Sequence, residues 1–299
     1  MICANRIVAV TGGARGLGRE YVLEFVRQGA KVVVNDLGVS RDGHGGGSDA
    51  ADELVAEIRA MGGEAVANYA DVADWDGAGS IVKTAIDAFG GLDVIVNNAG
   101  FLRDRMFANA TVDEWDAVMR VHLRGHFCVG NHAVRYWRDQ SKAGHKVDAR
   151  IINTSSGAGL QGSIGQAAYS AAKGGIASLT LVQAAELRRY GITANALAPA
   201  ARTRMTEEAF GEAMKAPEDG FDVNNPANVA PLVAWLGSAA SAHVTGRVFE
   251  IVGGRICLED GWRDGPDVDK GARWDPAELG PVVDDLLARA APVKKVWGS

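Results

Sequence analysis

Short runs rich in β-branched residues alternate with amphipathic segments along the chain, and this rhythm limits the fold more than any other feature. Short apolar strands separated by helices pack as a parallel sheet with helices on both faces, and its crossovers are right-handed. The sequence therefore predicts an α/β, doubly wound fold. The expected strands are RIVAV, KVVVND, EAVANYADV, LDVIVNNAG, ARIINTSS, GITANALAP and GRVFEIVGG, and the expected helices cover residues 16–28, 50–61, 78–89, 112–138, 166–190 and 227–237.

Composition excludes several classes of protein. The chain has 299 residues, 47% of them hydrophobic, with a formal net charge of −6. This negative balance argues against a general electrostatic grip on nucleic acid or on an anionic membrane. The longest uncharged run, residues 151–172, is too rich in serine, asparagine, glutamine and glycine to be a membrane span. The three widely spaced cysteines, Cys3, Cys128 and Cys257, favour buried thiols over a catalytic role, and no metal site is expected.

A glycine-rich turn follows the first expected strand. The stretch TGGARGLG, residues 11–18, opens the first helix and contains Gly12, Gly16 and Gly18. Glycines at such a turn let backbone amides approach a pyrophosphate at the helix N-terminus, where the helix dipole favours negative charge. Its place between a strand and a helix indicates a dinucleotide site.

The second strand ends on a residue that selects between two cofactors. Asp36 lies about 20 residues beyond the glycines, where a carboxylate accepts hydrogen bonds from the adenosine ribose and repels a 2′-phosphate. Arg15, inside the turn, argues instead for NADP, because it could hold the 2′-phosphate of that cofactor. A carboxylate beside a phosphate is a direct like-charge penalty, whereas a long arginine can turn to solvent, so NAD is the predicted cofactor.

A tyrosine and a lysine stand four residues apart in the stretch GQAAYSAAKGG. Tyr169 and Lys173 would share one helix face. A phenol has a pKa near 10, which a nearby ammonium and an oxidised nicotinamide would lower. Tyr169 is then a candidate base for a substrate alcohol, and Ser156, at the end of a strand, is a candidate to hold the reacting oxygen.

Together, TGGARGLG, NNAG (residues 97–100), Ser156 and YSAAK resemble the classical short-chain dehydrogenase/reductase family over nearly all of residues 5–254. The resemblance implies a Rossmann sheet of about seven strands, nicotinamide-dependent alcohol–ketone chemistry and a Ser–Tyr–Lys centre. It also implies cofactor contacts at the matching positions, with Lys173 on the nicotinamide ribose, residues 71 and 72 beside adenine and Thr203 near the carboxamide. The full set is Gly12, Arg15, Gly16, Leu17, Gly18, Asp36, Asp71, Val72, Asn98, Ala99, Gly100, Tyr169, Lys173, Pro199 and Thr203.

Two positions depart from the family pattern. The family has an asparagine in its middle helix that helps to hold a proton-relaying water, and VHLRG places His122 there. An imidazole can donate or accept a proton, so His122 is either part of a relay or a buried, structurally bonded histidine. The usual Pro-Gly after the sixth strand is Pro199-Ala200, which weakens the expected nicotinamide contact at this point.

Longer strings narrow the resemblance to one branch. VVVNDLG, NNAGFLRDRMF, RVHLRGHF and VAPLVAWL, with a glycine-rich loop at residues 38–47, resemble the (3R)-hydroxyacyl-CoA dehydrogenase part of peroxisomal multifunctional enzyme type 2 and its free-standing bacterial relatives. This implies NAD-dependent interconversion of a (3R)-hydroxyacyl-CoA and its 3-ketoacyl-CoA. A 17β-hydroxysteroid dehydrogenase or another secondary-alcohol dehydrogenase is the alternative within the class. A non-catalytic NAD-binding partner subunit is the alternative outside it.

Residues 255–299 extend beyond the length that the sheet requires. Asp275 and Pro276 resemble a cap and first helical residue, so a terminal helix of about 12 residues is expected in this extension. The extension would cover either the acyl pocket or a partner subunit, and residues 1–254 would form the dehydrogenase domain.

The family implies a homodimer or homotetramer, and the absence of an evident targeting segment favours the cytoplasm. Cations that could meet the phosphates of coenzyme A, or simply form a solvated face, are Arg103, Arg105, Arg124, Arg202, Arg204 and Lys215.

Overall fold

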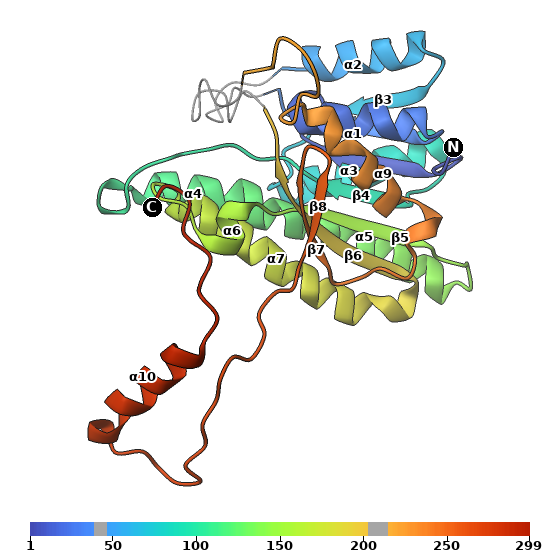
Figure 1. The fold of residues 1–299 in the computed structure, drawn as a ribbon. Coiled ribbons are helices and arrows are strands. Elements are labelled where there is room, and N and C mark those ends of the chain that lie inside the picture. Colours follow the sequence, from blue (N-terminus) through green and yellow to red (C-terminus); the bar gives the residue numbers. More distant parts are fainter. Residues whose placement is uncertain (39–46, 203–214) are drawn as a thin grey trace.

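A computed structural model describes residues 1–38, 47–202 and 215–299. Within these ranges the chain forms an eight-stranded sheet of order β3-β2-β1-β4-β5-β6-β7-β8 (Figure 1). The strands from β1 to β7 pair in parallel, and β8 is antiparallel to β7. The strands are β1 (Ile7–Thr11), β2 (Lys31–Asn35), β3 (Glu64–Asn68), β4 (Val94–Asn97), β5 (Ala149–Thr154), β6 (Ile192–Ala200), β7 (Val248–Val252) and β8 (Arg255–Glu259).

The helices cover both faces of the sheet, which confirms the doubly wound prediction. The side chains of β1 alternate, so that Val8 and Val10 join one core cluster with α1, α2 and α9, whereas Ala9 joins the other with α3, α5 and α7. The helices are α1 (Gly16–Arg27), α2 (Asp49–Ala60), α3 (Trp75–Phe89), α4 (Val112–Met119), α5 (Gly125–Lys142), α6 (Gly157–Gln161), α7 (Ala167–Leu187), α9 (Ala230–Gly237) and α10 (Leu279–Arg289).

The long middle helix differs from the expected continuous one. Residues 112–142 form α4 and α5 joined by a π-helical segment, η2 (Arg120–Arg124). Thr111 and Glu114 form a capping box at the start of α4. A π-helical turn inserts an extra residue into the helix and is frequent at functional sites. His122 lies inside this segment and is buried.

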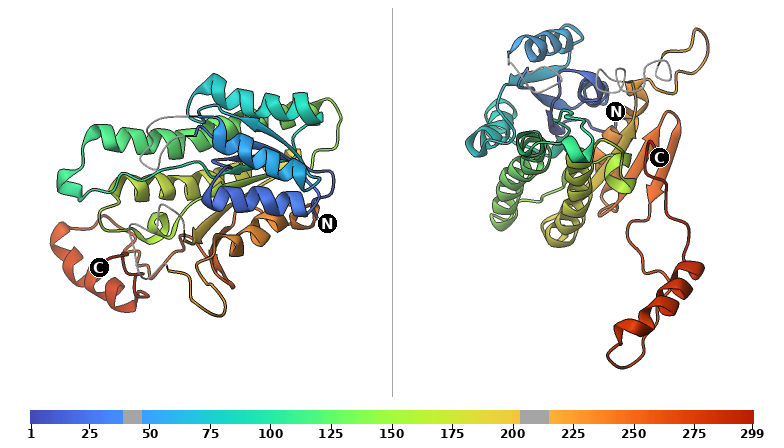
Figure 2. Two further views of the ribbon diagram at one scale, coloured as in Figure 1. Left: turned by 90° about the horizontal axis from the view of Figure 1, so that it is seen from above. Right: turned by 90° about the vertical axis from the view of Figure 1, so that its left-hand side faces the viewer.

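The sheet continues into the predicted extension. β8 begins at Arg255, directly after the boundary set at residue 254, and adds one strand to the expected seven. The chain then leaves the body, forms α10 and returns (Figures 1 and 2). Asp275 and Glu278 form a capping box ahead of α10, and the 11 residues of this helix confirm the predicted terminal helix. Short 3-10 turns complete the described elements: η1 (Phe107–Asn109), η3 (Arg188–Tyr190), η5 (Pro226–Asn228), η6 (Ala239–Ser241) and η7 (Pro276–Glu278).

The strand order reverses beside β1, whose neighbours are β2 and β4. Ligands of open α/β sheets bind at the carboxyl ends of the strands at such a switch point. Among the described residues, no helix is both long enough and apolar enough to cross a membrane.

Candidate active site

The glycine-rich turn has the geometry that the sequence predicts. Gly12 and Gly16 have φ values of 61° and 52°, which side chains on L-residues rarely allow. A Cβ on Gly18 would lie 2.0 Å from the carbonyl oxygen of Gly12, so helix and turn meet without room for a side chain. Within the described chain, no side chain caps the start of α1, and its first turn contains no acidic residue. The amides there suit a diphosphate.

The carboxylate of Asp36 lies beside this turn. Its two oxygens accept hydrogen bonds from the amides of Ala14 (3.0 Å) and Gly38 (2.9 Å). Arg15 is exposed at the mouth of the turn. A carboxylate fixed next to a diphosphate cradle suits the ribose hydroxyls of a dinucleotide, so these residues fit the expected cofactor.

Asn98 joins the end of β4 to the turn. Its side-chain amide donates to the carbonyl oxygens of Thr11 and Gly12, both at 3.1 Å. The main-chain amides of Asn98 and Ala99 donate to the Thr11 hydroxyl at 2.9 and 3.1 Å. These bonds bring two strand ends together at the predicted dinucleotide site.

The remaining expected cofactor residues lie along the same edge. Asp71 pairs with Arg120 of η2 at 2.6 Å, and Val72 packs where a Cβ on Gly125 would stand. Leu17 packs against the first core cluster, and Pro199 is near the end of β6. Thr203 lies outside the described residues, as do Arg204 and most of the glycine-rich loop at 38–47.

The three candidate catalytic residues meet where β5 and α7 adjoin. Ser156 caps α6, and its hydroxyl accepts the amide of Ala158 at 3.2 Å. Tyr169 and Lys173 stand one turn apart on α7, as predicted, and the Tyr169 phenol interacts with Ser156. The Lys173 Nζ lies 5.5 Å from the centre of the tyrosine ring and donates to the carbonyl oxygen of Thr154 at 2.6 Å.

The charges at this centre differ from the expectation. Burial raises the pKa of Tyr169 to about 12, although the interaction with Ser156 acts in the opposite direction. Burial also lowers the pKa of Lys173 to about 7. In the chain alone the pKa of Tyr169 is therefore raised rather than lowered, because loss of solvent is the largest cause of the shift. The phenol keeps its proton at neutral pH.

His122 is held by the backbone. Its Nε2 lies 2.8 Å from the carbonyl oxygen of Phe101 and 3.1 Å from the Phe101 amide nitrogen. Its ring meets the Tyr169 ring edge-on, with centroids 5.3 Å apart. Burial and the Lys173 charge lower its pKa to about 3, so it is neutral. Among the described atoms, His122 Nδ1 has no hydrogen-bond partner. The imidazole is thus held in place through Nε2, whereas Nδ1 has no partner among the described atoms.

Sequence reasoning missed a second buried histidine. His126 follows His122 by one turn, and its Nε2 lies 3.4 Å from the amide nitrogen of Thr154. Burial, with the charge of Lys173, holds its pKa well below the ordinary value. The spacing of four residues in RVHLRGHF was the available signal. The role of Ser155 was also missed, since its hydroxyl donates to the Lys173 carbonyl oxygen at 2.8 Å and fixes α7 against β5.

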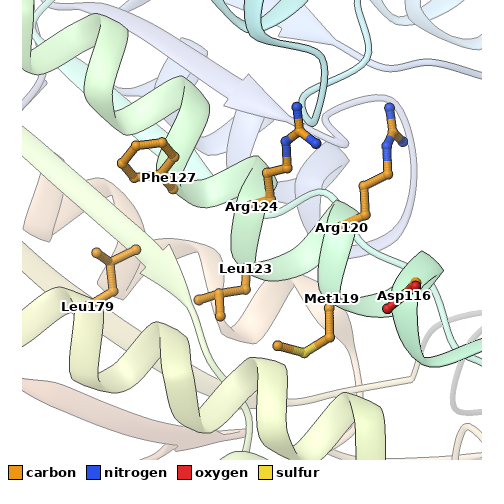
Figure 3. A pocket seen from close by; sticks show the side chains of 7 residues that line it. All are labelled: Asp116, Met119, Arg120, Leu123, Arg124, Phe127 and Leu179. Atoms are coloured by element: carbon orange, nitrogen blue, oxygen red, sulfur yellow. The ribbon is translucent and has the colours of Figure 1, made fainter. Parts of the chain in front are cut away.

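Most candidate cations for coenzyme A have other contacts. Arg105 pairs with Glu114 at 2.8 Å, and Arg202 pairs with Asp222. Arg103 lies over the Phe101 ring, 5.8 Å from its centre, and Lys215 is exposed. Arg124 lies on an open, mainly apolar groove between η2, the flanking α4 and α5, and α7 (Figure 3). The groove is lined by Asp116, Met119, Arg120, Leu123, Arg124, Phe127 and Leu179.

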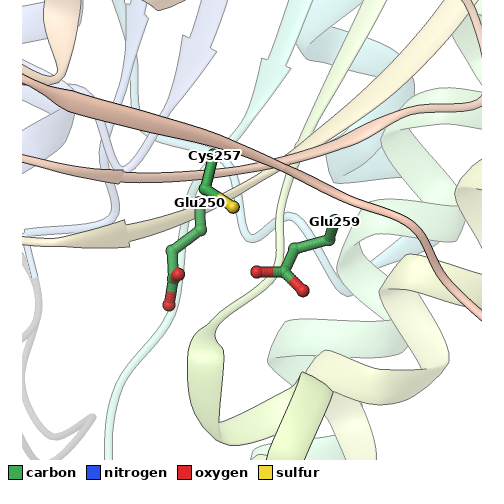
Figure 4. A group of neighbouring side chains, drawn as sticks. All are labelled: Glu250, Cys257 and Glu259. Carbon is green, nitrogen blue, oxygen red and sulfur yellow. The ribbon is translucent and has the colours of Figure 1, made fainter.

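Among the residues that the structure describes, one group of metal-ligand residue types lies outside this site. The side chains of Glu250, Cys257 and Glu259 come from β7 and β8, with ligand atoms within 4.8 Å of one another (Figure 4). Cations meet both carboxylates: Lys294 donates to Glu259 at 2.8 Å and Arg255 lies 3.5 Å from Glu250. These ion pairs compensate the acidic charges within the protein.

The ring of His122 leaves no room for a side chain at Gly100. A Cβ at Gly100 would lie 2.2 Å from Cε1 and 2.8 Å from Nδ1 of His122, and this buried ring cannot move aside freely. We expect Gly100→Ala to lower the free energy of unfolding by about 1–3 kcal/mol, as overpacking does, and to lower activity. Chemical denaturation measures the change. Adding His122→Ala should restore part of the loss, and Gly254→Ala, with open space around it, is the control. Additive losses in the double variant would contradict the clash.

Comparisons with known proteins agree with this geometry. A family model described as short chain dehydrogenase matches residues 6–213. The chain is 43% identical to hydroxyacyl-CoA dehydrogenase ChsB1 of Mycobacterium tuberculosis, covering 97% of this chain and 90% of that protein. It is 47% identical to peroxisomal multifunctional enzyme type 2 of Mus musculus, covering 84% of this chain but only 32% of the mouse protein. A crystal structure of a short chain dehydrogenase from Mycobacterium avium matches with a TM-score of 0.90 and 58% identity, over 100% of both chains.

Proposed function

Because the chain belongs to the short-chain dehydrogenase family, we propose that it interconverts a (3R)-hydroxyacyl-CoA and the 3-ketoacyl-CoA with NAD. It is an oxidoreductase acting on CH–OH groups. The observation that carries the proposal is the arrangement of the Tyr169 phenol, which interacts with Ser156 and has Lys173 one turn away. The names of ChsB1 and the multifunctional enzyme support the substrate class.

The chain offers a continuous set of groups to a nicotinamide dinucleotide. The amides at the start of α1 would hold the diphosphate, Asp36 the adenosine ribose and Lys173 the nicotinamide ribose. The bound cofactor supplies the hydride acceptor and, when oxidised, a positive charge. Asp71 and Val72 would flank adenine. The nicotinamide end would be met by Asn98, Ala99, Gly100, Pro199 and Thr203.

Tyr169 moves the proton in this proposal. During alcohol oxidation the phenolate accepts the hydroxyl proton, and during ketone reduction the phenol returns it. Ser156 donates a hydrogen bond to the reacting oxygen and shares its developing charge. The raised pKa of Tyr169 makes the phenol a proton donor at neutral pH, so oxidation requires an added positive charge to lower it. His122, neutral and with Nδ1 free, would take part in proton exchange with solvent.

The direct test is the initial rate of NADH formation by the purified protein. Substrates are (3R)- and (3S)-hydroxyacyl-CoAs of several chain lengths and a 17β-hydroxysteroid, each with NAD and with NADP. We expect turnover of the R thioesters with NAD. Turnover of the steroid alone would replace the proposal by the hydroxysteroid alternative. NADH binding without turnover of any substrate would contradict the proposal and favour a binding subunit.

Asp36 is predicted to set the cofactor preference. We expect Asp36→Asn to reduce the ratio of kcat/KM for NAD over NADP by about tenfold or more, because the like-charge penalty against a 2′-phosphate is removed. An asparagine oxygen can still accept one of the two loop amides. Arg15→Gln is the companion variant, and it should leave NAD turnover nearly unchanged. A wild-type protein that prefers NADP would refute the prediction.

We also propose that the protein is a homodimer or homotetramer. Phe127 on α5 and Leu181 and Val182 on α7 are each between 47% and 49% accessible, and Phe127 also lines the groove of Figure 3. A monomer found by light scattering at micromolar concentration would overturn this proposal.

A further inference from the structure

The last residues of the chain return to the candidate active site after the excursion through α10 (Figures 1 and 2). Trp297 forms a parallel bridge with Ser163. Its amide donates to the carbonyl oxygen of Gly162 at 3.2 Å, and its carbonyl oxygen accepts the amide of Ile164 at 2.9 Å. Trp297 therefore pairs with the loop that connects Ser156 to Tyr169.

The indole of Trp297 lies against the residue that follows the candidate catalytic serine. A Cβ on Gly157 would stand 2.6 Å from Cζ2 and 2.9 Å from Cη2 of the indole. Gly157 is the first residue of α6, whose cap is Ser156. The tryptophan ring thus packs on the bare backbone of α6 at its first turn.

The opposite side of α6 packs on α7. A Cβ on Gly159 would lie 2.5 Å from the carbonyl carbon of Lys173. The five-residue helix is therefore enclosed between the lysine backbone and the indole, and each contact depends on a glycine. Because the Ser156 hydroxyl accepts the Ala158 amide, a shift of α6 would carry the serine hydroxyl with it.

Two further contacts fix the returning segment. Lys294 donates to both oxygens of Glu259 on β8, at 2.8 and 3.0 Å. Val296 contacts the Gly162 position, where a Cβ would lie 3.5 Å from both of its methyl groups. The other side of the same loop is held by residues 104–105, through the Arg105 amide and the Gly165 carbonyl oxygen at 2.7 Å.

We propose that residues 294–299 position the proposed reaction's serine, with Trp297 as the anchor that fixes α6 and, through it, the Ser156 hydroxyl. This inference rests on the proposed function. Trp297 is a positioning residue, since it acts through Gly157 and α6 rather than by touching substrate. A hydroxyl displaced by about 1 Å is enough to lower turnover greatly.

The test compares Trp297→Ala, Trp297→Phe and Trp262→Ala in the full chain. Trp262 lies in the same extension and is fully exposed, so it is a matched control. For Trp297→Ala we expect kcat to fall about tenfold or more, with the KM for substrate and the Kd for NADH within about twofold of wild type, since the cofactor groups are untouched. Trp297→Phe should recover most of kcat. Unchanged kcat in Trp297→Ala would overturn the proposal.

Hydrogen exchange separates this inference from the proposed function. Peptides covering residues 157–166 should exchange faster in Trp297→Ala and not in Trp262→Ala, because α6 and the following loop lose the indole that packs on Gly157, so the hydrogen bonds of the Ala158 and Ile164 amides open more often. Unchanged exchange overturns the inference whatever the substrate proves to be. Absence of hydroxyacyl-CoA turnover in the wild type refutes the function alone, and exchange then decides whether the segment holds α6. Should Trp297→Ala not fold, Lys294→Gln, which removes an exposed ion pair, should give the same pattern in smaller degree.

Discussion

Tyr169→Phe is expected to lower kcat by about 10³-fold, which is within the range for loss of a general acid or base. The variant removes the hydroxyl that exchanges a proton with the substrate oxygen in the proposed mechanism, together with its interaction with Ser156. The phenyl ring keeps the edge-on contact with His122, so the site should remain packed. NADH affinity should therefore stay within a few-fold of wild type, as measured by fluorescence titration.

Tyr21→Phe is the matched control for this variant. Tyr21 is fully buried on α1, and among the described atoms its hydroxyl has no hydrogen-bond partner. Removing that hydroxyl should leave turnover unchanged and should not reduce stability, because no hydrogen bond is lost. Near-normal turnover by Tyr169→Phe would show that another group moves the proton.

The features predicted correctly from the sequence are those with local causes. The strands follow from short β-branched runs, and the start of α10 follows from Asp275 and Pro276. The glycine-rich turn was predictable because its backbone has positive φ values, which only glycine adopts readily. Tyr169 and Lys173 share a face because residues four apart in a helix always do. Each of these inferences needed only neighbouring residues, so each could be made before the structure.

The features that were missed depend on contacts between distant parts of the chain. The π-helical segment contains His122, which packs on Gly100 and bonds to Phe101, some 20 residues away. The return of Trp297 to Gly157 spans the whole extension. No periodicity encodes such a contact, because it depends on where the folded body leaves space.

The pKa values of Tyr169 and Lys173 also depend on one local effect and on one effect of the whole fold. The sequence correctly places a lysine beside a tyrosine, and the attraction between an ammonium and a phenolate is a local argument. Burial is not local: Tyr169 packs against the cluster that contains Phe101 and Val118, from other parts of the chain, and Lys173 is only 3% exposed. Loss of solvent disfavours the charged form of each, which raises the pKa of Tyr169 and lowers that of Lys173. Which effect dominates could be decided only once the packing was known.

Lys173→Met is expected to lower kcat by about 10²-fold or more while stabilising the fold at low pH. Activity falls because the variant removes the cation nearest the Tyr169 ring and the predicted ribose contact. Stability rises because Lys173 is only 3% exposed and its pKa is lowered to about 7. Each unit of lowered pKa corresponds to about 1.4 kcal/mol, so keeping this lysine charged in the fold costs roughly a few kcal/mol. Loss of its bond to the Thr154 carbonyl oxygen offsets part of that gain.

The sign of the pH dependence distinguishes this explanation from general stabilisation. In the unfolded chain the lysine holds its proton to a pKa near 10.4, whereas in the fold it releases the proton near 7. The unfolded state therefore binds more protons between these values, and the contribution of Lys173 to wild-type stability becomes less unfavourable as pH rises through that window. The advantage of Lys173→Met should thus be largest below pH 7 and shrink toward pH 10, in denaturant unfolding at one protein concentration. Lys83→Met, at an exposed lysine, should show no such trend. An advantage that does not change with pH would mean that the buried charge is not its cause.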